Sequence, residues 1–534
     1  MSSSLPSTSP QSSSEITRLG GAELARRIAA GDWSSVEVTR AFIQRIELVN
    51  RDLNAVVIPL FDSAIKAAEQ ADLAMARGDA LGPLHGVPVT IKECFHVAGT
   101  SSCIGLEALR SEIMPDDGVL VRRLRNAGAV ILGKTNIPQM MIWHECDNPV
   151  YGRTNNPWDL TRTPGGSTGG EAAIIAAGGS PLGLGNDLGG SIRVPCHFCG
   201  IHGIKPTSHR LPRTGSRGTL RGMEAVVSQA GPLARRVEDL ELGLRVLVGG
   251  SEETATPDVA PPTWTDPRSV HIRGMKIALW TNDDFFPASA ALARAVREAG
   301  TALAQRGAIV EEFAPPDVPE IMETYFSLLG ADGGADARRL TAGSKLDWRV
   351  ARMLRLAGLP LALRLPIVAG LRGFGQHWMS RLVGSTRPRS ANSYWQLVSR
   401  KNQLVRDFMH QLQARGYSAF LTPPHALPAM QHIKGFDLLP AASYAYLPNL
   451  LGVPAGVVSL TRVRPGEETG RIVSRDQTLR QAAAVDRGSA GLPVGVQVAA
   501  PHWREDIVLA IMRALEDHFA SQSEYPCHDH ASNT

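Results

Sequence analysis

The interpretation of this sequence depends on two glycine-rich stretches, Gly165-Gly166-Ser167-Thr168-Gly169-Gly170 and Gly185-Asn186-Asp187-Leu188-Gly189-Gly190-Ser191-Ile192-Arg193. Neither stretch matches G-x-x-x-x-G-K-[ST] or a complete dinucleotide fingerprint, so a phosphate-binding loop is not indicated. Consecutive glycines let backbone N–H groups turn toward one point, and a serine that follows them places its hydroxyl beside those donors. Such stretches are typical of a site that combines a nucleophile with an oxyanion hole.

A serine nucleophile needs a base, and the fifteen histidines of the chain show no obvious motif for that role. His85 and His144 remain open on residue type alone. Lys92 is a further candidate because it ends an apolar segment, residues 86–92, that predicts a β-strand. Burial lowers the pKa of a lysine, which makes the neutral amine available at neutral pH.

Taken together, Lys92 and the two glycine stretches resemble the amidase signature family. The family pattern is a strand lysine followed by G-G-S-[ST]-G-G and then by G-[TN]-D-x-G-G-S-[IV]-R, and the gaps of 75 residues from Lys92 to Ser167 and 24 residues from Ser167 to Ser191 also suit it. The resemblance implies a serine hydrolase that cleaves amide bonds through an acyl-enzyme. We expect no cofactor and no metal.

The resemblance also implies a role for each residue of the site. Ser191 is the nucleophile, and Ser167, on an expected cis peptide bond, relays the proton to neutral Lys92 and returns a proton to the departing amine. The expected oxyanion donors are the backbone N–H groups of Leu188, Gly189, Gly190 and Ser191. Thr168, Asp187 and Arg193 are expected to support the site, and Met141 and Ile142 to line the substrate pocket.

Four further stretches resemble the fatty acid amide hydrolase branch of this family, at residues 179–185, 198–201, 451–458 and 491–497. This implies hydrolysis of fatty acid amides, such as N-acylethanolamines and primary fatty amides, with esters as a further class. The first alternative is an amidase for small aliphatic or aryl amides. The second is the glutamine-amidase subunit of a tRNA amidotransferase, which works within a complex.

A basic segment lies between Arg338 and Arg389, where eleven Lys/Arg face one acid, a sum of 11 − 1 = +10. Within residues 349–389, apolar stretches alternate with single arginines, and Phe374 and Trp378 add aromatic rings. A helical pair of this composition can lie among lipid headgroups with its arginines on anionic lipid. The resemblance places a membrane-contacting cap here, at about 338–390. A buried helix pair with solvated arginines is the alternative.

Mixed helix and strand signals without a clear linker predict one large α/β domain over residues 15–520. The resemblance implies a large twisted mixed β-sheet with helices on both faces. The Ser/Pro-rich residues 1–14 predict a disordered tail, and residues 521–534 a flexible one. Strands are predicted at Ala419–Thr422, Val457–Leu460 and Val494–Val498, and a capping box at Ser34 predicts a helix start.

The remaining features limit compartment and partners. No stretch approaches the ~20 apolar residues of a membrane span, and no signal peptide is recognisable, so we expect a cytoplasmic protein with peripheral membrane contact. A net charge of +4 is too small to indicate nucleic-acid binding. Cys196 and Cys199 form a lone C-x-x-C, which predicts free thiols, and Cys527-His528-Asp529-His530 is interpreted as a frayed tail. A homodimer is compatible with the sequence.

Overall fold

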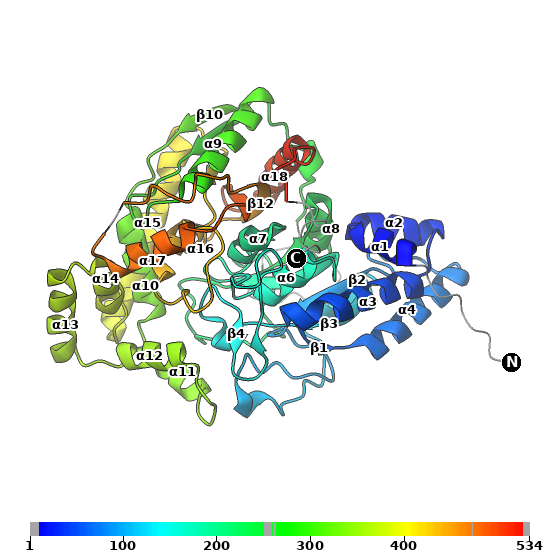
Figure 1. Cartoon of the computed structure of the whole chain (residues 1–534), viewed down its shortest axis with the longest axis horizontal. Helices are drawn as coiled ribbons and strands as arrows, with labels where there is room; N and C mark the ends of the chain where they lie inside the picture. Colours follow the sequence, from blue (N-terminus) through cyan, green and yellow to red (C-terminus); the bar gives the residue numbers. More distant parts are fainter. Residues whose placement is uncertain (1–9, 250–258, 260–262, 473, 527–534) are drawn as a thin grey trace.

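The computed structural model describes residues 10–249, 259, 263–472 and 474–526 (Figure 1). Its centre is one sheet, whose strands are β1 (Val56–Pro59), β2 (Pro88–Lys92), β3 (Val130–Thr135), β6 (Leu182–Asp187), β7 (His202–Lys205), β8 (Gln229–Ala234), β9 (Lys276–Leu279), β10 (Ile309–Glu312), β11 (Ala419–Thr422), β12 (Ala455–Arg462) and β13 (Pro493–Ala499). Their spatial order is β1-β3-β2-β6-β8-β7-β12-β13-β11-β9-β10. A small separate pair is formed by β4 (Asp147–Asn148) and β5 (Gly152–Arg153).

Helices surround this sheet. They are α1 (Pro10–Arg18), α2 (Gly21–Ala30), α3 (Ser35–Leu53), α4 (Phe61–Ala76), α5 (Val119–Asn126), α6 (Gly169–Ala176), α7 (Arg193–Cys199), α8 (Val237–Val248), α9 (Ala290–Gln305), α10 (Val318–Leu329), α11 (Ala335–Leu340), α12 (Trp348–Ala357), α13 (Leu361–Gly373), α14 (His377–Ser385), α15 (Ala391–Ala414), α16 (Ser443–Leu451), α17 (Gln477–Asp486) and α18 (Glu505–Phe519).

Both faces of the sheet are covered. The Leu182 side chain lies against Gly243 of α8, whereas a Cβ atom on Gly183 would collide with Glu171 of α6. Successive strand residues point to opposite faces, so α6 and α8 pack on opposite sides of β6. The predicted mixed sheet with helices on both faces is confirmed.

The strand directions determine where polar side chains gather. β2 runs parallel to β3 and to β6, with Thr90 opposite Gly183 and Ile91 opposite Leu184. Carboxyl ends of neighbouring parallel strands meet at one edge, where open α/β sheets bind ligands. Lys92 ends β2 and Asp187 ends β6, so the two sequence regions singled out above converge at this edge.

Both terminal segments are more structured than the sequence predicted. Residues 1–9 lie outside the described part, but α1 already begins at Pro10, and Ile16 is completely buried. At the other end, Pro526 is buried and the Tyr525 N–H donates to the Gln522 carbonyl. Residues 10–14 therefore belong to helix α1, and the C-terminal segment 521–526 ends on a buried residue. The candidate metal run at 527–530 lies outside the described residues.

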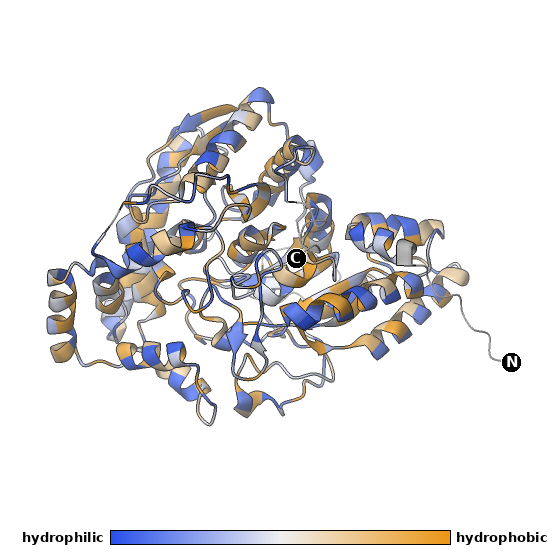
Figure 2. Cartoon of the chain, in the orientation of Figure 1, coloured by the Kyte–Doolittle hydropathy of each residue, from blue (hydrophilic) through white to orange (hydrophobic). Residues whose placement is uncertain are grey.

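The basic segment folds as the short helices α11 to α14, which stand at one edge of the molecule (Figure 1). Within the described residues, no single helix is long and apolar enough to cross a membrane. Only α12 and α13 together have that length and composition, and they are bent by 112°. Figure 2 shows α13 as a largely apolar helix at this edge. Leu361, Leu363 and Leu365 are 53, 56 and 63 % exposed, and Phe374 is 82 % exposed.

Two arginines of this segment do not behave as predicted. Arg349 and Arg364 are only 1 and 2 % exposed, so they cannot meet anionic lipid. Arg364 instead donates to the carbonyls of Val383, Thr386, Leu356 and Ala357. An arginine with five donors can satisfy several helix-end carbonyls at once, so Arg364 fastens α13 to the ends of α12 and α14. Trp378 is also half-buried, with its ring edge-on to Phe285 at 4.6 Å between centroids.

Candidate active site

Lys92 occupies the centre of the site and is completely buried. Its Nζ donates to Ser167 Oγ at 2.7 Å, to Thr168 Oγ1 at 2.8 Å and to Asn186 Oδ1 at 2.8 Å. Three acceptors match the three donors of an ammonium group, yet none of them is charged. Burial lowers the pKa of Lys92 to about 8, so a substantial neutral fraction exists near neutral pH.

Ser167 and Ser191 lie on segments that contact each other through their backbones. The Gly166–Ser167 peptide bond is cis, as the resemblance implied. The Thr168 N–H donates to the Ser191 carbonyl at 3.1 Å, which joins the first glycine stretch to the second. Helices α6 and α7, which follow the two stretches, pack against each other and hold this arrangement.

Asp187 and Arg193 form a fully buried ion pair beneath the second glycine stretch. Arg193 Nη2 donates to Asp187 Oδ1 at 3.0 Å, and Nε donates to Oδ2 at 3.0 Å. Burial alone would raise the pKa of Asp187, but the guanidinium of Arg193 holds that pKa well below its usual range. The carboxylate also accepts from Asn449 Nδ2 and from the Ile192 N–H, so it anchors the loop from both sides.

The expected oxyanion donors are not all available. The Gly190 N–H donates to Asp187 Oδ1 at 2.7 Å, so Gly190 does not belong to the set that faces the substrate. This corrects the sequence-based expectation, which took the N–H groups of all four residues from Leu188 to Ser191 to face the substrate. The remaining expected donors are Leu188, Gly189 and Ser191.

Two side chains hold the carbonyls of the same loop. Tyr325 Oη donates to the Leu188 carbonyl at 3.2 Å, and His144 Nε2 lies 2.9 Å from the Gly189 carbonyl. Because the C=O and N–H of one peptide unit point in opposite directions, fixing the Leu188 carbonyl also fixes the Gly189 N–H. Burial lowers the pKa of His144 to about 4, so its ring is neutral and Nε2 carries the proton that the carbonyl accepts.

A largely apolar pocket opens beside Ser191, and the predicted residues Met141 and Ile142 line it. Side chains of the α12 and α14 helices form part of its wall. Its lining residues are Met140, Met141, Ile142, His144, Leu188, Gly189, Ser191, Thr219, Leu220, Tyr325, Phe326, Leu329, Gly330, Asp332, Gly334, Ala337, Met353, Leu354, Leu356, Ala357, Leu382, Val383, Thr386, Phe436, Leu439 and Tyr446. An apolar cavity with a few polar groups at one end is typical of a small-molecule site.

Comparison with known proteins agrees with this geometry. A family model described as Amidase matches residues 37–509. The chain belongs to the amidase signature family. It is 35% identical over 509 residues to fatty-acid amide hydrolase 1 of Sus scrofa, covering 92% of this chain and 84% of that protein. It is 31% identical over 518 residues to a glutamyl-tRNA(Gln) amidotransferase subunit of Acidothermus cellulolyticus, covering 94% and 95%. A solved fatty acid amide hydrolase superposes with a TM-score of 0.81 at 27% identity, covering 96% and 86%.

The two histidines that sequence left open as bases contact backbone carbonyls in this amidase. His85 Nε2 lies 3.1 Å from the carbonyl of Ala71 in α4. His144 contacts the Gly189 carbonyl in residues 188–191, which we call the oxyanion loop. Lys92 is thus the candidate base with a direct hydrogen bond to a serine hydroxyl of the site.

Several residues of the amidase site were not predicted. Asn186 stood inside the quoted stretch without a role, although it accepts a hydrogen bond from Lys92. Tyr325 and Tyr446 come from α10 and α16, and their rings stack at 4.7 Å between centroids beside the loop. Nothing near them in sequence marks these tyrosines as site residues, because only the packing of α10 against α16 brings them there.

The five cysteines within the described residues are not placed for catalysis. Cys94, Cys103, Cys146, Cys196 and Cys199 are buried free thiols. Burial raises the pKa of Cys196 and of Cys199 well above the usual value, so both remain protonated and unreactive. They fill space in α7 as small apolar side chains.

Proposed function

We propose that this amidase hydrolyses fatty acid amides to a fatty acid and an amine, with Ser191 as nucleophile, Ser167 as proton relay and Lys92 as base. The observation that carries the proposal is the 2.7 Å contact between the buried Lys92 amine and Ser167 Oγ, beside an apolar pocket that contains Ser191. A hydroxyl becomes a useful nucleophile only when a neighbouring base takes its proton.

The reaction follows from these positions. Ser191 Oγ forms a bond to the amide carbonyl carbon while its proton passes to Ser167 Oγ, and the Ser167 proton passes to neutral Lys92. The tetrahedral intermediate then expels the amine, which takes a proton back through Ser167. Water attacks the resulting ester on Ser191, with the same relay acting as base, and releases the fatty acid.

Charge that develops on the carbonyl oxygen is stabilised by backbone N–H groups of Leu188, Gly189 and Ser191. Removing one such donor typically costs about 10²–10³ in rate. Thr168 and Asn186 accept the other two Lys92 hydrogens. Because these acceptors are uncharged, they orient the amine without raising its pKa as a carboxylate would.

The pocket supports a lipid-like acyl group. Its walls beyond Ser191 are apolar side chains such as Leu329, Leu354 and Val383, with few polar partners for a small hydrophilic amide. The relative of Sus scrofa is a fatty-acid amide hydrolase by name, and the similarity covers most of both chains. Each buried methylene contributes about 0.8 kcal/mol, so a long acyl chain binds more tightly than a short one here.

The alternatives differ in what fills this pocket. A small-amide or aryl-amide amidase would use the same three catalytic groups in a short, closed cavity. The similarity to the amidotransferase subunit of Acidothermus cellulolyticus makes a glutamine amidase the second alternative. Such an enzyme would need polar partners for the α-amino and α-carboxyl groups of glutamine. The apolar wall formed by α12 and α14 favours the fatty amide.

The helix between α12 and α14, α13, indicates how a lipid substrate reaches the site. We infer that α13 contacts the membrane peripherally, because it presents Leu361, Leu363 and Leu365 to solvent at the outer end of the cap. The exposed Arg372, in the last turn of α13, can meet anionic headgroups. Within the predicted region 349–389, Arg349 is buried and takes no part in this contact.

Turnover of a chain-length series tests the substrate class. With primary amides from acetamide to oleamide in detergent micelles, kcat/KM is expected to rise with each methylene until the pocket is filled. Equal or faster turnover of the short amides would contradict the fatty amide proposal. L-glutamine serves as a third substrate, and glutaminase activity gained on adding the other amidotransferase subunits would favour the second alternative.

Covalent labelling tests the mechanism separately. A fluorophosphonate probe is expected to attach to Ser191, as shown by peptide mapping. Labelling at another residue in active enzyme would overturn the assignment of the nucleophile, whatever the substrate. The Ser191→Ala variant is the control for non-specific labelling.

A further inference from the structure

One segment, residues 139–145, forms part of the wall of the pocket that contains Ser191. Met140, Met141, Ile142 and His144 all line the pocket. Met140 and Met141 have φ angles of 59° and 57°, a backbone conformation that side chains with a Cβ rarely adopt. Such a conformation persists only where surrounding contacts hold it. Several of the contacts that hold segment 139–145 come from the start of the cap, residues 345–349.

Gln139 connects the first end of this segment to the cap. Its Nε2 donates to the Lys345 carbonyl at 2.9 Å, and its Oε1 accepts from the Asp347 N–H at 2.9 Å. The same Nε2 also donates to the Gly105 carbonyl at 3.0 Å. A completely buried amide with these partners joins residues 345–347 to the backbone that precedes Met140.

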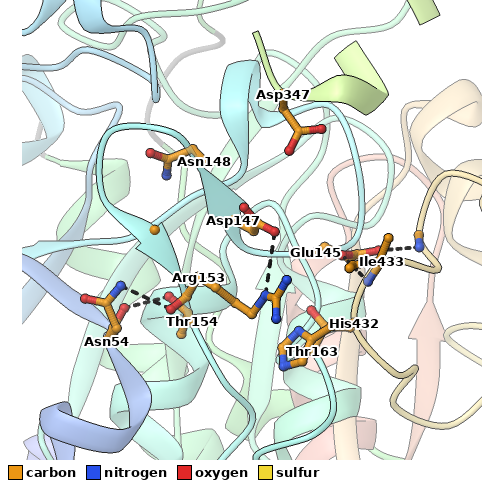
Figure 3. A network of polar contacts seen from close by, with 12 residues as sticks. Asn54, Glu145, Asp147, Asn148, Arg153, Thr154, Thr163, Asp347, His432 and Ile433 are labelled. Atoms are coloured by element: carbon orange, nitrogen blue, oxygen red, sulfur yellow. Dashed lines mark hydrogen bonds and ion pairs between the residues drawn. The ribbon is translucent and has the colours of Figure 1, made fainter. Parts of the chain in front are cut away.

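Arg349 connects the second end. Its Nη1 donates to Glu145 Oε2 at 2.7 Å, its Nη2 lies 3.0 Å from Asp147 Oδ2, and its Nε donates to Asp347 Oδ1 at 2.8 Å. The guanidinium also lies over the Trp143 ring, 5.1 Å from its centre. Figure 3 shows the three carboxylates that contact Arg349, those of Glu145, Asp147 and Asp347, with Glu145 bonded to the backbone at Ile433 and Asp147 paired with Arg153.

The residues that Arg349 holds also contact the catalytic loops. His144, between Trp143 and Glu145, bonds the Gly189 carbonyl at 2.9 Å. A Cβ atom on Gly166 would collide with the carbonyl oxygens of Trp143 and Glu145, so this backbone lies directly against the residue before Ser167. Residues 143–145 therefore contact the cap on one side and both glycine stretches on the other.

We propose that Arg349 is a positioning residue for catalysis, which holds residues 143–145 and through them the backbone at Gly166 and Gly189. The inference rests on the proposed function, since it assigns a role within that active site. It makes the first turn of α12, the helix whose later residues Met353 and Leu354 line the pocket, part of the catalytic geometry. Arg349 then supports both the helix α12, against which an acyl chain packs, and the alignment of the two loops that carry Ser167 and Ser191.

The test compares Arg349→Lys and Arg349→Met with Arg355→Met as the matched control. Arg355 lies on the same helix, is exposed, and bonds only the Ala351 carbonyl in the described structure. The substrate is a short amide such as butyramide, which lacks the long acyl chain of a fatty amide. Rates are expressed per site titrated with fluorophosphonate, so unfolded protein does not contribute.

The expected result is a fall in kcat of about 10²-fold for Arg349→Met, since a displacement of ~1 Å has that effect on an aligned site. Arg349→Lys keeps the charge but loses the planar donor fork and should recover part of the loss. Changes in KM should stay below about threefold, and Arg355→Met should match the wild type. An unchanged kcat per titrated site on butyramide, with losses confined to long amides, would overturn the inference.

The outcome for the wild type separates this inference from the proposed function. Wild-type protein that neither hydrolyses amides nor labels at Ser191 contradicts the proposed function. Active wild type with unaffected Arg349 variants contradicts only the positioning role. If Arg349→Met does not fold, as its melting curve would show, Arg349→Lys and Glu145→Gln give the same comparison, because each keeps most of the buried volume.

Discussion

Lys92 Nζ lies 2.7 Å from Ser167 Oγ, at the end of a strand in which every residue is buried. The lysine is surrounded by neutral oxygens, and the nearest carboxylates are not bonded to its amine. Desolvation therefore outweighs the attraction of Asp187 and Glu171, and it lowers the pKa of Lys92 to about 8. Lys92 can therefore accept the Ser167 proton only in the fraction of molecules in which its amine is deprotonated.

The pH dependence of turnover follows from that pKa. Below pH 8, kcat/KM should fall about tenfold per pH unit as Lys92 becomes protonated, and above pH 8 it should reach a plateau. A profile of amide hydrolysis between pH 6 and 10 measures this. A plateau that begins already near pH 6 would indicate a histidine base instead.

Two buried lysines, Lys92 and Lys134, allow a matched comparison of substitutions. Lys92→Met should lower kcat by about 10²–10⁴ through loss of the base. Lys134, on the adjacent strand β3, is equally buried and bonds Ser102 Oγ at 2.9 Å, away from the serines of the site. Lys134→Met should lower the melting temperature while leaving kcat per titrated site nearly unchanged.

Gly189 faces Tyr325 so closely that the two positions should be coupled. A Cβ atom at Gly189 would overlap Tyr325 Oη and lie 3.0 Å from ring atoms of Tyr446. Gly189→Ala should therefore displace the oxyanion loop and lower kcat/KM by about 10²–10³. Tyr325→Phe alone removes one hydrogen bond and should lower it by about tenfold.

The double variant gives the decisive comparison for this contact. Gly189→Ala with Tyr325→Phe should be more active than Gly189→Ala alone, since the hydroxyl that collides is gone. A double-mutant cycle on kcat/KM measures the coupling between the two positions. The loss in the double variant is expected to be smaller than the sum of the two single losses. Additive losses would show that the tyrosine does not restrict the loop.

Glu171 predicts a pH-dependent stability. Its carboxyl accepts from the Thr135 hydroxyl at 2.7 Å and from Thr90, and burial raises its pKa to about 8. The folded state thus binds a proton that the unfolded state releases above about pH 4.5. Stability should fall as pH rises toward 8, by at most about 1.4 kcal/mol per pH unit from this group.

Glu171→Gln removes this titration while keeping the shape of the side chain. Lys92 titrates in both proteins, so its effect cancels in the comparison. Urea unfolding at pH 6 and pH 8 should show the wild type losing more free energy of unfolding than the variant. A difference between the two proteins that does not change with pH would contradict the raised pKa.

The apolar face of α13 predicts membrane binding that can be removed. Leu363→Ser with Leu365→Ser should weaken flotation with anionic vesicles by about tenfold per leucine. Leu48→Ser on α3 is the control, since Leu48 is 63 % exposed, as is Leu365. Turnover of a soluble short amide should be the same in all variants. Equal flotation of the wild type and the double variant would remove the membrane proposal.

The sequence by itself determined the local elements and the reaction class. The strand Ala419–Thr422 and the capping box at Ser34 are confirmed, because their signals lie within a few consecutive residues. The two glycine stretches and Lys92 sufficed to recognise the family, since their spacing is specific. The predicted strand that ends at Lys92 is confirmed as β2.

Only the tertiary structure decided which of these groups are available and what holds them. The Gly190 N–H is occupied by Asp187, Arg364 is enclosed by helix ends, and Arg349 reaches Glu145 across 204 residues of sequence. A hydrogen bond or ion pair depends on distances of a few ångströms in the folded chain. Residue type and spacing do not contain those distances when the partners lie on elements far apart in the sequence.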